Sequence, residues 1–222
     1  MPRVEIYIIT KEEGANLSKF DILGEYDTEK DALVSGFLAA LNNFARDVNF
    51  PAGVSLIRSG SLEARFATGK YILCVLIIDY SMPLGLMTEP ILSGLANEIT
   101  EKFEELYEKE LIDGQKKKVF KTTAFNGFNK EIEKIMETYN QETFILYQKL
   151  ILIEAMDAKV PQKWCLPLLE RASNGENIIP DLSEIPDQYS VQLQKAIDKV
   201  NESAAPVWEI FQVPTTEFQP FE

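Results

Sequence analysis

The strongest hydrophobic pattern in the chain is the unbroken run YILCVLII at residues 71–78. It is much shorter than the roughly 20 residues of a membrane-spanning helix. A strand with one solvent-exposed face would alternate apolar and polar positions, and this run does not. The run therefore predicts a central strand that is covered on both faces. Shorter β-branched or aromatic runs predict further strands at 4–10, 20–23, 54–58 and 62–68.

A helix between these strands is predicted by apolar residues spaced four and three positions apart. A capping-box pattern at Thr28 and Asp31 precedes this row, and Pro51 follows it. We expect the row to pack against the sheet, with Gly36 allowing a close approach. The row consists of Leu33, Phe37, Leu41, Phe44 and Val48.

A second amphipathic helix is predicted after the central strand, with a stop near Gly114. Its charged face, with Glu104, Glu105 and Glu108, is expected to be solvated, and Asp79 is expected to cap the turn before the helix. Its apolar face is expected to cover the sheet. That face consists of Ile91, Leu92, Leu95, Ile99, Phe103, Leu106 and Tyr107.

Helical periodicity continues through the second half, with apolar rows at 128–139, 166–172 and 189–200. The run at 144–155 fits a helix slightly better than a strand. The fold class is therefore α/β in the α+β sense, with a single antiparallel sheet of about five strands and helices packed on it. We divide the chain into an α/β domain at 1–114, a helical extension at 115–203 and a tail at 204–222.

Two segments are candidate partner-binding sites. In the tail, Trp208 and Phe211 would either bind another protein or pack on this protein's own surface, and self-docking is preferred because exposed apolar residues are costly. The basic cluster of Lys116, Lys117, Lys118 and Lys121 would contact an acidic partner or a membrane, or would be a solvated linker, which is preferred. We expect at most weak peripheral membrane contact, because each lysine contributes only about 1 kcal/mol.

Composition and charge narrow the functional classes. The formal net charge of −13 argues against nucleic-acid binding. The chain has no histidine, which removes the commonest general base and metal ligand, so we predict no enzyme activity, no metal and no cofactor. Cys74 and Cys165 are expected to be free thiols in a reducing compartment. No signal-peptide or transmembrane pattern is present, so we expect a soluble, cytoplasmic protein.

The element order, with DALVSGFLAALNNFARDV in the first helix and LEARFATGKYILCVLIIDYS in the last two strands, resembles the longin and roadblock family of α/β domains. The resemblance covers about residues 3–112 and is greatest to longin-type domains of archaeal relatives of trafficking and GTPase-regulating proteins. It includes the small residues Gly36, Ala39 and Ala40 on the packing face of the helix. It implies a non-enzymatic platform that binds a small Ras-like GTPase, a membrane-trafficking partner, or a second copy in a homodimer.

Two other functions are compatible with the same element order. One is a ligand-sensing α/β domain, which should have an enclosed pocket with a few convergent polar groups. The other is a profilin-like actin-associated module, which should change the kinetics of actin polymerisation. A partner platform should instead have an exposed apolar groove or an unpaired strand edge.

Overall fold

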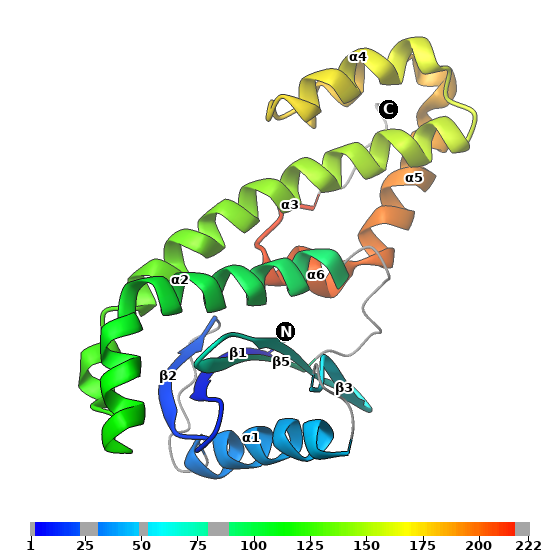
Figure 1. Cartoon of the computed structure of the whole chain (residues 1–222). Helices are drawn as coiled ribbons and strands as arrows, with labels where there is room; N and C mark the ends of the chain where they lie inside the picture. The colour runs from blue at the N-terminus through cyan, green and yellow to red at the C-terminus, as the bar shows by residue number, and fades with distance from the viewer. Residues whose placement is uncertain (1–2, 23–30, 49–52, 80–88, 216–222) are drawn as a thin grey trace. The chain divides into compact units, whose positions relative to one another are not determined.

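The structure is a computed structural model that describes residues 3–22, 31–48, 53–79 and 89–215 (Figure 1). The chain divides into two compact units, Met1–Pro83 with Glu89–Met136 and Leu84–Thr88 with Glu137–Glu222, which we describe separately. The first unit extends beyond the boundary predicted at 114, and the predicted tail at 204–222 belongs to the second unit. The predicted capping box at Thr28 lies outside the described residues.

The first unit is built around one antiparallel sheet of five strands in the order β2-β1-β5-β4-β3 (Figure 1). This confirms the predicted fold class of an antiparallel sheet with helices. The predicted central strand is also confirmed, because β5 pairs with β1 on one side and with β4 on the other. The strands are β1 (Arg3–Thr10), β2 (Asn16–Asp21), β3 (Leu56–Ser59), β4 (Leu62–Thr68) and β5 (Ile72–Asp79).

One face of this sheet is closed by α2 (Glu89–Lys117). Side chains alternate between the faces of a strand, and Cys74 of β5 marks the α2 face because its thiol lies beside the side chain of Thr100 on α2. On α2, Phe103 is fully buried, with its ring centroid 4.8 Å from Phe128 and 5.3 Å from Phe125 in the short 3₁₀ helix η3 (Thr122–Phe125). An apolar layer thus covers this face.

The helix α2 continues past its predicted stop at Gly114 and ends at Lys117. Lys118 follows with a left-handed φ of 52°, and the N–H of Val119 donates to the carbonyl of Gly114 at 3.1 Å, as in a Schellman cap. Gly114 is required inside the helix for another reason, since a Cβ there would lie 2.3 Å from the ring of Phe120.

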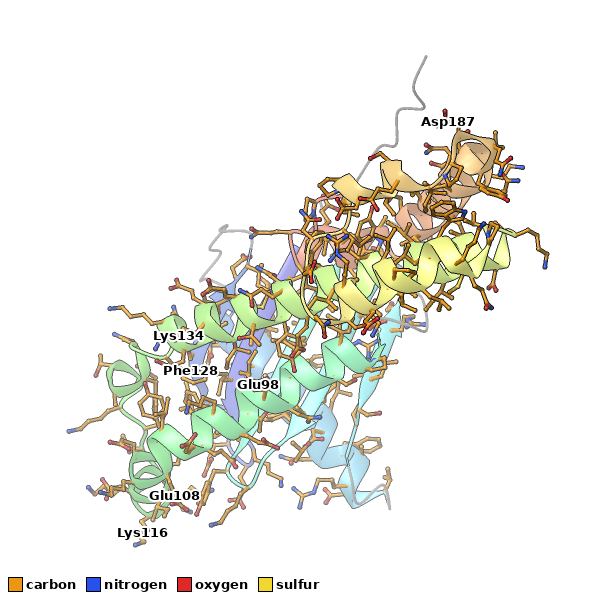
Figure 2. All side chains as sticks on the ribbon, turned by 90° about the horizontal axis from the view of Figure 1, so that it is seen from above. Glu98, Glu108, Lys116, Phe128, Lys134 and Asp187 are labelled. Atoms are coloured by element: carbon orange, nitrogen blue, oxygen red, sulfur yellow. The ribbon has the colours of Figure 1, made fainter. Side chains whose placement is uncertain are left out.

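The charged face of α2 is only partly solvated. Glu105 and Glu108 are exposed, as predicted, and Figure 2 shows Glu108 toward the end of α2 that carries Lys116. The prediction is wrong for Glu104, whose carboxylate accepts the backbone N–H groups of Lys70, Tyr71 and Ile72 at 3.0, 2.6 and 3.1 Å. This carboxylate therefore joins α2 to the turn between β4 and β5.

Charged residues also lie beneath α2, which the sequence did not predict. Glu63 is completely buried, and its carboxylate forms ion pairs with Arg65 and with Arg58, the latter at 2.6 Å. Arg65 also donates to the hydroxyl of Ser93 on α2 at 3.4 Å. A buried charge needs such partners, because its desolvation is otherwise unfavourable by several kcal/mol.

The second unit is helical. The predicted rows at 128–139 and 144–155 form one continuous helix, α3 (Asn129–Asp157), whose residues up to Met136 belong to the first unit. Two short 3₁₀ helices lie between the predicted rows at 166–172 and 189–200. The elements after α3 are α4 (Gln162–Ser173), η4 (Pro180–Glu184), η5 (Asp187–Tyr189), α5 (Ser190–Ser203) and α6 (Ala205–Ile210).

Candidate protein-interaction surface

The helix α1 (Asp31–Asp47) lies on the face of the sheet opposite α2 (Figure 1). Its predicted apolar row does form one side of the helix, but the prediction that this row packs on the sheet is wrong. Leu33, Phe37 and Phe44 are 76%, 60% and 65% exposed, Val48 is exposed as well, and Leu41 is half-buried. Large exposed apolar side chains in one row are unusual on a protein surface.

The other side of α1 packs on the sheet, and its buried residues are small or polar except for Leu38. Ser35, Leu38, Ala39 and Asn42 are buried there. The turn after β1 approaches closely at Gly14, where φ is +68° and a Cβ would lie 2.8 Å from the Cβ of Ala39. Small side chains are therefore needed at this contact, and the large ones occupy the outer side.

Gly36 has a different role from the predicted one. No atom lies within 4 Å of where its Cβ would be, and the residue is exposed. Its Cα instead lies 3.3 Å from where a Cβ of Gly14 would be. The close approach is thus made by Gly14, and Gly36 leaves open space on the outer side of α1.

A groove of about 570 Å³ lies between α1 and the half of the sheet that α1 does not cover. We call it the α1 groove. Leu62 at its edge is 45% exposed, whereas Ala64 and Ile77 form its floor with less exposure. Every lining residue of the α1 groove is apolar except Glu5. The lining residues are Leu33, Val34, Phe37 and Leu38 of α1 and Glu5, Ile57, Leu62, Ala64 and Ile77 of the strands.

The one charged residue of the α1 groove is paired. Lys19 Nζ lies 3.2 Å from a carboxylate oxygen of Glu5, and both side chains are buried. The Tyr7 hydroxyl lies 3.5 Å from the other oxygen, and Lys19 Nζ lies 5.2 Å from the centroid of the Tyr7 ring. Lys19 neutralises the Glu5 carboxylate, so the lining of the α1 groove is complementary to an apolar surface.

The predicted basic cluster lies at and just beyond the end of α2, and its four lysines are exposed. Figure 2 shows Lys116 at this end of the helix. Lys117 forms an ion pair with Asp113 at 2.6 Å, and Lys118 belongs to the helix cap. None of the four lysines of this cluster lines the α1 groove.

The predicted tail residues are part of the second unit's core. Trp208 and Phe211 are buried, and Trp208 Nε1 donates to the carbonyl of Val200 at 2.9 Å. The Trp208 ring lies 5.3 Å from the Tyr147 ring, and the Phe211 ring lies 6.1 Å from that of Tyr139. This packing corresponds to the self-docking alternative, and binding of these rings to a partner would require α6 to detach.

The thiols are structural. Cys74 and Cys165 are buried and unpaired with each other, and burial raises the pKa of Cys74 to about 12. In the described ranges, no group of three or more histidine, cysteine, aspartate or glutamate side chains could hold a metal ion. None of the helices in those ranges has the length and apolarity needed to cross a bilayer.

The sequence interpretation placed four exposed residues on the side of the helix that packs on the sheet: Leu33, Phe37, Phe44 and Val48. A signal was present in the sequence. The helix also has a second, narrower row of Ser35, Ala39 and Asn42, which can fit a close contact while the large row cannot. The periodicity showed which residues share a side but did not show which side is inside.

Comparison with known proteins adds no assignment: no protein-family model, no curated protein and no solved structure matches this chain.

Proposed function

We propose that the first unit is a non-catalytic protein-interaction module that binds a partner through the α1 groove and the exposed row of α1. The observation that carries this proposal is the exposure of Leu33 and Phe37 at the edge of an apolar groove. Aromatic side chains are enriched at protein–protein interfaces, and Phe37 is the aromatic residue that lines this groove.

The occupant that fits this surface is an amphipathic helix of the partner. The exposed row runs along α1 from Leu33 to Phe44, so it offers a ridge against which a second helix packs, and the groove beside the ridge accepts its apolar side chains. Fully burying a Leu or Phe side chain contributes about 1.5–3 kcal/mol. A few such side chains are enough for a specific contact.

The partner class that we propose is a small Ras-like GTPase or a membrane-trafficking protein. This class comes from the resemblance to longin and roadblock domains, which depends on the order of strands and helices along the chain. The strands and helices of the first unit follow that order. A second copy of the chain is the competing occupant. The buried free thiols are compatible with a reducing, cytoplasmic location. A ligand sensor is less well supported, because the α1 groove is open and nearly without polar groups.

The proposal is tested by capture of the small GTPases of the source organism, each loaded with GDP or a GTP analogue, on the immobilised chain. Phe37→Glu should reduce capture at least tenfold, because a charge is placed where an apolar contact is needed. Val191→Glu, on α5 and 63% exposed, is the matched control and should bind as the wild type does. Equal capture by all three proteins would contradict the proposal, and light scattering of the wild type alone would detect a homodimer.

A further inference from the structure

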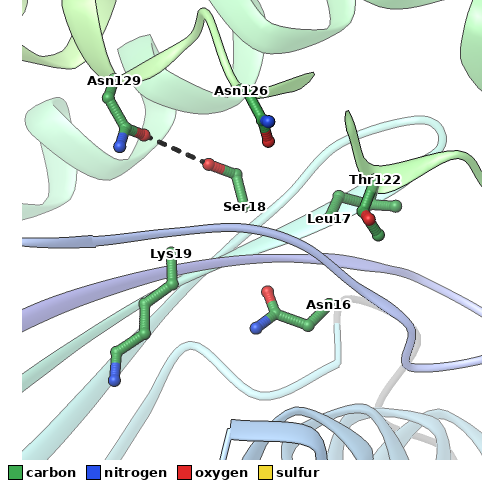
Figure 3. A pocket seen from close by; sticks show the side chains of 7 residues that line it. All are labelled: Asn16, Leu17, Ser18, Lys19, Thr122, Asn126 and Asn129. Atoms are coloured by element: carbon green, nitrogen blue, oxygen red, sulfur yellow. Dashed lines mark hydrogen bonds between the residues drawn. The ribbon is translucent and has the colours of Figure 1, made fainter. Parts of the chain in front are cut away.

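A second groove, of about 400 Å³, lies along β2 and is separate from the α1 groove. On one side it is lined by the consecutive residues 16–19 of β2, and on the other by Thr122, Asn126 and Asn129 (Figure 3). Side chains of consecutive strand residues point to alternate faces. A groove that touches a run of consecutive residues therefore lies along the edge of the strand, where its backbone is accessible.

β2 is at the end of the sheet order, with β1 on its only paired side in the described part of the chain. An edge strand offers a row of backbone N–H and C=O groups that another extended segment can bind. Leu17 is the extra residue of an irregularity in the pairing, since Ile8 pairs with Ser18 and Ile9 with Asn16. The bulge makes this edge irregular, which disfavours long pairing with another sheet.

The opposite wall is made of neutral hydrogen-bonding side chains. Asn126 and Asn129 each carry a donor and an acceptor, and Ser18 donates to Asn129 Oδ1 at 3.4 Å across the groove (Figure 3). Asn16 Oδ1 is buried and has no hydrogen-bond partner among the described residues. The one charged lining residue, Lys19, is paired with Glu5. In a chain of net charge −13, this groove thus has no uncompensated charge among its lining residues.

We propose that this β2-edge groove binds a single extended peptide segment of a partner protein by β-strand addition. The backbone of the segment pairs with the outer edge of β2, and its uncharged polar side chains hydrogen-bond to Asn126, Asn129 and Thr122. The site is distinct from the α1 groove, because the two share no lining residue.

The test uses random nonapeptides displayed on phage and selected on the full-length protein. Peptides that are recovered are synthesised, and their affinities are measured by fluorescence anisotropy. Thr122→Trp fills the groove and should weaken binding at least tenfold. Thr123→Trp is the matched control, because Thr123 is the exposed neighbour that does not line the groove. Circular dichroism establishes that both variants are folded.

Backbone pairing gives the second readout. Only every second N–H of an added strand faces β2. N-methylation of the peptide nitrogens that face β2 should therefore abolish binding, and N-methylation of the intervening nitrogens should leave it nearly unchanged. Phe37→Glu should bind the peptides with wild-type affinity. The proposal is overturned if no recovered peptide is sensitive to Thr122→Trp, if N-methylation has no alternating effect, or if Phe37→Glu abolishes the binding.

Discussion

The two faces of the sheet are covered to different extents. On the α2 face, Ile72, Cys74 and Leu76 of the central strand are completely buried, and α2 contributes Phe103 with no exposed area. On the α1 face, Leu73 and Val75 are buried as well, but Leu62 and, on α1, Leu33, Phe37 and Phe44 remain exposed. Both faces have enough apolar residues to be fully covered, but only the α2 face is. We therefore expect the apolar residues of the open face to contribute less to stability than those of the α2 face, and we assign the proposed binding role to them.

The largest expected effect comes from removing the buried residues of α6 from the core of the second unit. Deleting residues 204–222 removes Val207, Trp208, Ile210 and Phe211, all of which are buried. Since each kcal/mol corresponds to about 4–8 °C in a unit of this size, we expect the melting temperature of the second unit to fall by at least about 10 °C. Fluorescence of Trp164 provides the signal. An unchanged melting temperature would show that α6 contributes nothing to this core.

The α2 face is tested by Phe103→Ala. Removing this buried ring should lower the free energy of unfolding of the first unit by about 3–5 kcal/mol, because it leaves a cavity in the aromatic cluster. Leu106→Ala, three residues along the same helix at a position that is 45% exposed, should cost no more than about 1 kcal/mol. Both tryptophans belong to the second unit, so labelling of Cys74 in urea, in a Cys165→Ser background, reports on the first. Similar costs for the two variants would remove the distinction between closed and exposed positions.

A smaller effect is expected at Glu104. Glu104→Ala leaves three backbone N–H groups of the β4–β5 turn without their acceptor and should cost about 2–3 kcal/mol. Glu105→Ala on the solvated side should stay within about 0.5 kcal/mol of the wild type. The same urea titration measures both. A neutral Glu104→Ala would mean that water replaces the carboxylate without loss.

The buried thiol on the α2 face predicts a pH dependence. The pKa of Cys74 is raised by burial to about 12 from 9.0, so above pH 9 the unfolded thiol ionises while the folded one stays protonated. The unfolded state then binds fewer protons, and stability falls as the pH rises between these values. At pH 10 we expect Cys74 to account for a loss of about 1 kcal/mol relative to pH 8. Cys74→Ala should show a shallower decline, and an identical decline in both proteins would contradict the assignment.

Much of the first unit was predictable from the sequence. The run at 71–78 identified the central strand because a strand that is buried on both faces has no polar positions. The short connection between β4 and β5 indicates their antiparallel pairing, whereas β1, the other neighbour of β5, comes from the start of the chain and its pairing was not predicted. The stop at Gly114 was placed too early because Phe120 packs on it, a contact that sequence spacing does not show.

The candidate site was predicted less well than the fold. The row from Leu33 to Val48 was identified correctly as one side of a helix, but its orientation depends on Gly14, which comes from a turn far away in the sequence. Likewise, Glu104 was expected to be solvated, since nothing near it in the sequence indicates the backbone N–H groups that it accepts. Local periodicity gives the side of a helix, whereas tertiary packing decides which side is buried.

The smallest expected effect is the most direct test that the outer row of α1 is surface and not core. In the double variant Leu33→Glu/Phe37→Glu, the urea dependence of Cys74 labelling gives the free energy of unfolding of the first unit. We predict that it stays within about 1 kcal/mol of the wild type, because both side chains are already mostly in water. A loss of 4 kcal/mol or more, about what burying two unpaired charges in a core would cause, would contradict the open face on which the proposed function depends.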